Sequence, residues 1–197
     1  DRTFNSKKQR AKDILSFIKE MNTNCTFHFE VAADLFDDEM LSIISEMPVE
    51  RVQFEIGIQS TNLQTLQEVQ RKTNLDRVFE NIKTLTSFGN CHVHIDLIAG
   101  LPYDNLESFS KAINTCYYLN TQMLQLGFLK LLKGSALRKE TNKWQFVYNP
   151  FPPYEIIKNH LLTENEIMFL QDIEQVVEKF HNTGMYKNTI DFAVEKL

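Results

Sequence analysis

The sequence predicts an α/β fold in which about four parallel strands alternate with helices in an incomplete barrel, followed by a helical C-terminal extension. Segments with strand periodicity alternate with segments of helical periodicity from the N-terminus to about residue 134. The repeat of roughly 30 to 40 residues is the length of a β–α–β unit, whose strands are parallel. Each strand segment also has one apolar and one polar side, whereas parallel strands covered on both faces are apolar throughout.

Strands are expected where apolar and polar residues alternate and the apolar positions are β-branched, aromatic or aliphatic. Four segments have this pattern: residues 25–33, 51–59, 91–99 and 123–132.

Helices are expected between the strands, where apolar residues recur three or four positions apart. They cover residues 6–21, residues 37–47, two segments between the second and third strands, and residues near 105–118. The acidic residues at 37–39 suit a helix N-terminus. Thr61 and Gln64 have the spacing of a capping box, and Asp76 is a candidate N-cap for the next helix.

The alternation stops near residue 134, and the remaining chain is expected to be an extension. NPFPPY (149–154) is rich in proline and interrupts regular structure. Thr163 and Glu166 form a second capping-box pattern, ahead of an amphipathic helix and a short last helix. The apolar side of the amphipathic helix carries Ile167, Leu170, Ile173, Val176, Val177 and Phe180. We therefore expect a barrel part over 1–148 and a helical extension over 149–197 that packs on it.

The composition excludes several classes of protein. The chain has 197 residues, of which 43% are hydrophobic and 24% charged, as expected for a globular protein with one core. Its net charge is -5 and its basic residues are scattered, which argues against nucleic acid as a partner. No apolar run approaches the roughly 20 residues that cross a bilayer, and no secretory signal is recognisable. We expect a cytoplasmic protein that does not enter a membrane.

The three cysteines are Cys25, Cys91 and Cys116. Their number is odd and their spacing is wide, so neither a disulfide framework nor a cysteine-built metal site is expected. A reducing compartment fits this pattern, and all three are expected to be buried thiols.

Polar residues repeat on one side of successive strands. On the first three strands they are His28 and Glu30; Gln53, Glu55, Gly57 and Gln59; and His92, His94 and Asp96. A buried polar group without a partner costs roughly 1–3 kcal/mol, so the repetition favours a wet or ligand-binding inner surface. Each residue taken singly also fits an ordinary interior hydrogen bond, Gly57 also fits a bulge, and an open sheet with one wet face is an alternative.

Three motifs at the expected strand ends resemble radical S-adenosylmethionine (radical SAM) enzymes: GIQS (57–60), VQRKT (69–73) and DLIAGLPY (96–103). They are similar to the branch that includes anaerobic coproporphyrinogen III oxidase and the cobalamin-associated anaerobic cyclases. DRTFN, FHFEV and LQLGFLKLLKGS resemble the group labelled magnesium-protoporphyrin IX monomethyl ester oxidative cyclase. The resemblance covers roughly residues 1–148.

The resemblance implies a TIM-like partial (β/α)6 barrel with a site for S-adenosylmethionine. Gln59 and Asp96 would approach the ribose hydroxyls of this cofactor. Arg71 would pair with its methionine carboxylate, which suits a guanidinium fork, and Glu30 would make polar contacts nearby. Gly57 would leave space for the ligand. Gly100 and Pro102 would shape the loop beside its adenine.

The CxxxCxxC loop that holds the [4Fe–4S] cluster in this family is absent from the sequence, and the spacing of the three cysteines cannot replace it. We therefore expect a fragment of a longer enzyme that lacks the first two βα units and is inactive alone. The resemblance implies a small-molecule substrate and anaerobic chemistry, and leaves cobalamin open for the full-length protein. The unpaired sheet edge of such a fragment would favour dimerisation.

Two other hypotheses stay open. His92 and His94 form an HxH pattern with Asp96 two residues on, and His28 could face them; these ligand types suit zinc in a metal-dependent hydrolase. The chain could instead be a non-catalytic α/β scaffold that binds partners through the apolar stripe of its C-terminal helices.

Overall fold

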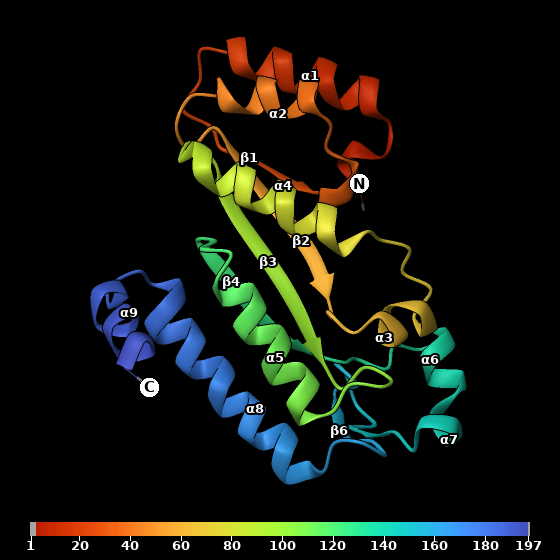
Figure 1. The fold of residues 1–197 in the computed structure, drawn as a ribbon. Helices are drawn as coiled ribbons and strands as arrows, with labels where there is room; N and C mark the ends of the chain where they lie inside the picture. The colour runs from red at the N-terminus through yellow and green to blue at the C-terminus, as the bar shows by residue number, and fades with distance from the viewer. Residues whose placement is uncertain (1–2, 197) are drawn as a thin grey trace. The chain divides into compact units, whose positions relative to one another are not determined.

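A four-stranded parallel sheet forms the centre of the fold, so the predicted α/β class is confirmed. The computed structural model describes residues 3–196. The sheet has the order β1–β2–β3–β4 (Figure 1). Each strand lies within its predicted segment: β1 (Phe27–Glu30), β2 (Val52–Gln59), β3 (His92–Ala99) and β4 (Met123–Phe128). β1 is short because it pairs with β2 only from Phe27↔Val52 to Glu30↔Glu55.

Helices follow the strands as the spacing predicted. Those ahead of β4 are η1 (Phe4–Ser6), α1 (Lys8–Glu20), η2 (Ala33–Leu35), α2 (Asp38–Ser45), α3 (Leu63–Glu68), α4 (Leu75–Phe88) and α5 (Leu106–Tyr117). After β4 come α6 (Ala136–Lys139), α7 (Thr141–Trp144), β5 (Val147–Tyr148), β6 (Ile156–Lys158), α8 (Glu164–Val176), η3 (Val177–Asn182) and α9 (Lys187–Lys196).

Two of the predicted helix caps are wrong. The side chain of Asn62 caps α3 by accepting a hydrogen bond from the backbone N–H of Gln64, so Thr61 is not the cap. Asn74 caps α4 by accepting from Arg77 N–H, while Asp76 lies inside the first turn. Asparagine is as good an N-cap residue as aspartate or threonine. The backbone conformation therefore decided which of the neighbouring residues became the N-cap.

The described residues form two compact units. The first comprises residues 3–58, 73–96 and 116–123, and the second residues 59–72, 97–115 and 124–196. In the first unit α1 lies beside α2, and α2 contacts α4 (Figure 1). The core of this unit takes apolar residues from both strands and helices: Phe36, Met40, Ile44, Val52, Phe54, Ile56, Ile82, Leu85, Val93 and Ile95. The apolar sides of β2 and β3 are therefore buried as predicted.

The second unit holds the C-terminal segments. β5 and β6 pair antiparallel, with Val147 opposite Lys158. NPFPPY lies in the turn between these two short strands, as the proline content predicted. The predicted capping box of α8 is present, because Thr163 Oγ1 accepts from Glu166 N–H and the Glu166 carboxylate accepts from Thr163 N–H.

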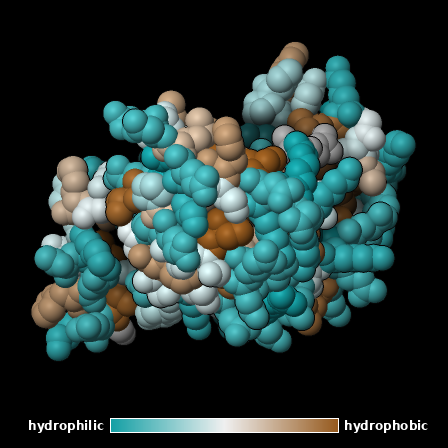
Figure 2. Space-filling model, turned by 90° about the horizontal axis from the view of Figure 1, so that it is seen from above, coloured by the Kyte–Doolittle hydropathy of each residue, from teal (hydrophilic) through white to brown (hydrophobic). Residues whose placement is uncertain are grey.

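The amphipathic pattern of α8 is only partly buried. Ile167 and Leu170 are buried in the second unit, whereas Met168, Phe169 and Val176 are about half exposed. Figure 2 shows hydrophobic side chains scattered among hydrophilic ones on one face of the molecule. In the part of the chain that the structure describes, no helix has the length and apolar character needed to cross a membrane.

Candidate functional site

The polar side of the sheet carries two close pairs of an imidazole and a carboxylate in the first unit. His28 on β1 places Nε2 2.9 Å from Glu55 Oε2 on β2. The strand register sets His28 opposite Gln53 and Glu30 opposite Glu55, so this pair runs diagonally between the strands. His28 is exposed and Glu55 is half-buried. The Glu55 carboxylate therefore has a partner, His28, on the neighbouring strand of the same sheet.

A second pair lies along β3. Nε2 of His94 is 2.9 Å from Oδ1 of Asp96, and both side chains are largely removed from solvent. His92 lies on the same side of β3, and its pKa is lowered mainly by partial burial and further by the neighbouring His94 and His28. Alternation along this strand thus gathers three ionisable groups on one side, as the sequence predicted.

The strand ends carry two of the predicted site residues. Glu30 is the last residue of β1 and is exposed, and Gln59 is the last residue of β2 and is half-buried. Asp96 lies deeper, because β3 continues to Ala99. Gly57 lies inside β2 rather than at its end.

Gln59 has a left-handed backbone conformation, with φ of 71°. This region costs a residue with a side chain on the order of 1–3 kcal/mol, and such residues cluster at ligand sites. Ser60, which follows it, is 1% exposed. The chain therefore turns sharply at the end of β2 and holds Gln59 in a strained conformation.

In the second unit the loop after β2 is bonded to the loop after β3. Thr65 Oγ1 donates to the carbonyl of Pro102 over 2.7 Å, and this contact is buried. Asn62 Nδ2 donates to the carbonyl of Tyr103 over 3.0 Å. These bonds fix the chain after Gln59 against the loop that contains Gly100 and Pro102.

Asp104 lies at the centre of this network and is 1% exposed. Burial raises the pKa of its carboxyl group, against hydrogen-bonding side chains of Ser60, Ser108, Asn62 and Thr65 that favour the charged form. The Ser108 hydroxyl donates to Oδ1 over 3.0 Å. Sequence reasoning missed this aspartate, although its place directly after the GLPY motif was a usable signal.

Gly100 is fixed by its backbone and its surroundings. Its φ is 88°, and a Cβ atom there would lie 3.0 Å from two side-chain carbons of Ile156. Its carbonyl accepts a 3.1 Å hydrogen bond from Asn159 Nδ2. A glycine is therefore required where the chain after β3 meets the C-terminal segment.

Arg71 follows α3 and is half-buried, and its backbone N–H donates to the Leu66 carbonyl over 2.8 Å. Of the residues expected to contact a cofactor, three belong to the first unit and four to the second. They are Glu30, Gly57 and Asp96 in the first, and Gln59, Arg71, Gly100 and Pro102 in the second.

Comparison with solved structures associates this fold with radical SAM enzymes. Coproporphyrinogen III oxidase (HemN) from Escherichia coli, a radical SAM enzyme, aligns over 87% of this chain and 37% of its own, with 18% identity and a TM-score of 0.60. The radical SAM methyltransferase TsrM from Kitasatospora setae aligns over 64% of this chain and 26% of its own, with 13% identity and a TM-score of 0.54. The archaeal Methanocaldococcus infernus Elp3 aligns over 71% of this chain and 34% of its own, with 14% identity and a TM-score of 0.50.

At these low identities it is the TM-scores that establish a shared fold, that of the radical SAM partial barrel. The chain spans between 26% and 37% of the length of these structures. Residues 142–197 match a family described as a protein of unknown function (DUF4080). The comparison with curated proteins gave no match.

The cysteines do not fit an iron–sulfur cluster. Cys25 is exposed, against the prediction that all three would be buried, because it precedes β1 outside the core. Burial raises the pKa of Cys91 to about 11 and that of Cys116 to about 12. Burial therefore disfavours the thiolate form, which is the form that binds metals, at both cysteines.

The zinc hypothesis also lacks support. Among residues 3–196, no group of three or more His, Cys, Asp or Glu side chains could hold a metal ion. Nε2 of His94 is turned to Asp96, and Nε2 of His28 to Glu55. Nε2 of His94, the second histidine of the HxH pattern, therefore already has a carboxylate beside it.

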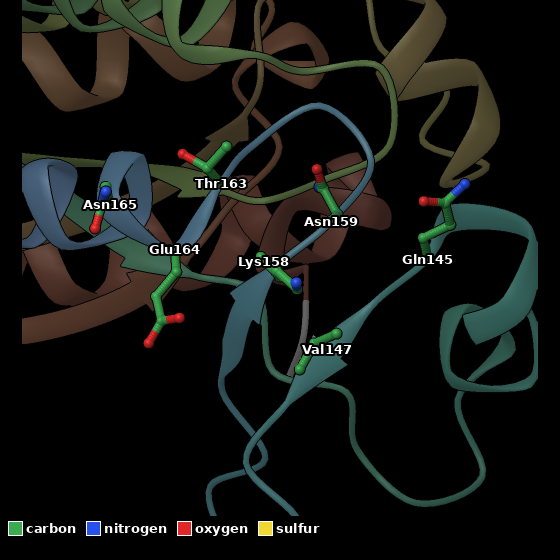
Figure 3. Close-up of a pocket in the computed structure, with 7 residues that line it drawn as sticks. All are labelled: Gln145, Val147, Lys158, Asn159, Thr163, Glu164 and Asn165. Atoms are coloured by element: carbon green, nitrogen blue, oxygen red, sulfur yellow. The ribbon is translucent and has the colours of Figure 1, made fainter.

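A cavity of about 560 Å³ lies in the second unit, beside the β5–β6 hairpin and the start of α8 (Figure 3). Its lining residues are Gln145, Val147, Lys158, Asn159, Thr163, Glu164 and Asn165. The amide of Asn159 is used internally, because its oxygen accepts from the N–H groups of Leu161 and Leu162 and its nitrogen donates to Gly100. The Thr163 hydroxyl is also used internally, because it donates to the Glu166 carboxylate of the capping box over 2.7 Å.

Proposed function

We propose that this chain supplies S-adenosylmethionine contacts in a radical SAM enzyme. The observation that carries the proposal is Gln59, a polar residue held at φ of 71° at the carboxyl end of β2. Ligand-contacting groups of parallel barrels lie at these strand ends. The shared fold supports the same assignment.

The proposed contacts match the chemistry of the cofactor. The Gln59 amide and the Asp96 carboxylate can accept hydrogen bonds from ribose hydroxyls. Arg71 is a permanent cation that suits the methionine carboxylate, and Glu30 offers acceptors at the end of β1. Gly57 would leave room for the ligand. Gly100 and Pro102 would shape the loop beside the adenine. S-adenosylmethionine itself supplies a sulfonium centre whose reductive cleavage starts radical chemistry.

The [4Fe–4S] cluster is proposed to be held by a CxxxCxxC segment outside these 197 residues, because Cys25, Cys91 and Cys116 do not fit it. This chain alone is then inactive. Oxidative cyclisation of a tetrapyrrole-like small molecule under anaerobic conditions is the substrate chemistry that we propose for the complete enzyme. Cobalamin is a second cofactor to test, and TsrM has been determined with cobalamin and a [4Fe–4S] cluster bound.

The test uses the complete protein that contains this chain, reconstituted anaerobically with iron and sulfide. We expect a cluster spectrum, S-adenosylmethionine binding by calorimetry and reductant-dependent formation of 5′-deoxyadenosine. Arg71→Met should weaken binding by about tenfold or more, because the carboxylate loses a charged partner. The exposed Lys72→Met is the matched control. A protein that forms no cluster and no 5′-deoxyadenosine would refute the proposal.

A further inference from the structure

His94 and Asp96 share one side of β3, because residues two apart in a strand point the same way. Nε2 and Oδ1 are 2.9 Å apart, but the two groups are not aligned for a linear hydrogen bond. The contact is therefore a close approach of the imidazole nitrogen to one carboxylate oxygen.

This pair is mostly shielded from water. His94 is 7% exposed, and the Asp96 side chain is 16% exposed. Water and salt screen such a pair much less than a surface pair. A buried polar pair is a poor source of stability, since apolar side chains of similar volume often do as well or better. Stabilisation of the fold is therefore a poor explanation for this pair, and we look for another role.

We infer that His94 is a positioning residue that holds one carboxylate oxygen of Asp96, so that this carboxylate is oriented for the ribose hydroxyls of S-adenosylmethionine. The inference rests on the proposed function, in which Asp96 contacts the ribose. A carboxylate that is already oriented loses less conformational freedom when the ligand binds. Supporting contacts of this kind hold a binding group in its productive geometry.

Neighbouring groups provide the matched control. His92 is an imidazole on the same side of the same strand, two residues further from Asp96. It is half-buried, and its pKa is lowered mainly by burial and further by His94 and His28. A general change in the polarity of this side of the sheet would affect His92 and His94 variants alike, whereas positioning of Asp96 requires His94.

The experiment measures the dissociation constant of S-adenosylmethionine on the complete, reconstituted protein. His94→Met should raise it about tenfold, and His92→Met should change it less than about twofold. His94→Gln should restore most of the affinity, because its side-chain amide nitrogen can take the place of Nε2. In an Asp96→Asn background, His94→Met should add almost nothing, since no carboxylate remains to be oriented.

The outcomes separate the two claims. A folded His94→Met protein with unchanged affinity overturns the positioning role and leaves the proposed function standing. Equal losses from His92→Met and His94→Met also overturn it. Wild-type protein that binds no S-adenosylmethionine refutes both claims. If His94→Met does not fold, His94→Asn and His94→Gln decide, because the shorter amide cannot reach Asp96; equal affinities of these two variants overturn the inference.

Discussion

At the scale of single residues, Gln59 is one of the positions where local backbone preference and the structure disagree. A residue with a side chain is disfavoured at φ of 71°, yet the sequence keeps a glutamine rather than a glycine there. The surrounding loop must hold this conformation. Ser60 is buried there, and Thr65 makes a buried hydrogen bond to the loop after β3.

Gln59→Gly should raise the free energy of unfolding by about 1 kcal/mol, because glycine adopts positive φ without strain. The same change should weaken S-adenosylmethionine binding, because the amide is lost. Gln53→Gly is the matched control, since Gln53 lies within β2, and it should lower the free energy of unfolding by about 0.5–1 kcal/mol. Urea denaturation of both variants measures the difference, and a loss of stability in Gln59→Gly would contradict the strain.

Asp104 makes stability depend on pH. Burial raises its pKa above the ordinary value of 3.8, so the folded protein binds this proton more tightly than the unfolded chain. Its contribution to stability is fully present below the unfolded pKa and is lost as pH rises through the folded pKa. The free energy of unfolding of wild type, relative to Asp104→Asn, should therefore fall as pH rises from below 3.8 through the raised pKa.

Denaturation of both proteins at several pH values from 3.5 to 7 checks this prediction. A wild-type-minus-variant difference that does not change with pH would contradict the role of Asp104 burial.

At the scale of elements, the end of α1 depends on the side chain of Arg51, the residue directly before β2. The guanidinium of Arg51 donates hydrogen bonds to the carbonyls of Ile18, Met21 and Thr23, and Arg51 is 9% exposed. These carbonyls lie at and just beyond the C-terminus of α1, where most carbonyl groups lack the hydrogen bonds of the helix interior, although that of Ile18 also accepts from Met21 N–H. Arg51 therefore fixes the connection between α1 and β1.

Arg51→Met should lower the free energy of unfolding by about 2–4 kcal/mol, because buried carbonyl groups lose a charged donor. Lys83→Met, on the exposed side of α4, should change it by less than about 0.5 kcal/mol. Chemical denaturation of the two variants makes the comparison. Similar values for both would show that these three hydrogen bonds contribute little.

The first turn of α4 tests the cap that the structure assigns. Asn74→Ala should lower the free energy of unfolding by about 1 kcal/mol, because Arg77 N–H loses its acceptor. Asp76→Ala should cost only a few tenths of a kcal/mol through the helix dipole. If the two losses were reversed in size, Asp76 would be the cap after all.

At the scale of the whole molecule, glycines show where distant segments constrain one another. Gly100→Ala should be the more destabilising of two similar changes, at about 2–3 kcal/mol, because the new methyl group would press on Ile156 in addition to the unfavourable φ. Gly89 has φ of 68° and no atom within 4 Å of the added Cβ, so Gly89→Ala should cost only about 1 kcal/mol. Thermal unfolding should rank them, and equal losses would contradict the close packing at Gly100.

The sequence by itself determined the order of strands and helices, the apolar and polar sides of β2 and β3, and the capping box of α8. These features depend on residues two to four positions apart, and such short periods can be read directly from a sequence. The likeness of the strand-end motifs to radical SAM enzymes also led to the fold that the solved structures share.

Only the tertiary structure decided which distant side chains lie together and which backbone positions are strained. His28 meets Glu55 across 27 residues of chain, and Gly100 is confined by Ile156 from a later segment. The left-handed turn at Gln59 and the burial of Asp104 depend on contacts between loops that are far apart in sequence. No local pattern encodes such contacts, because each forms only when the folded sheet brings distant segments together.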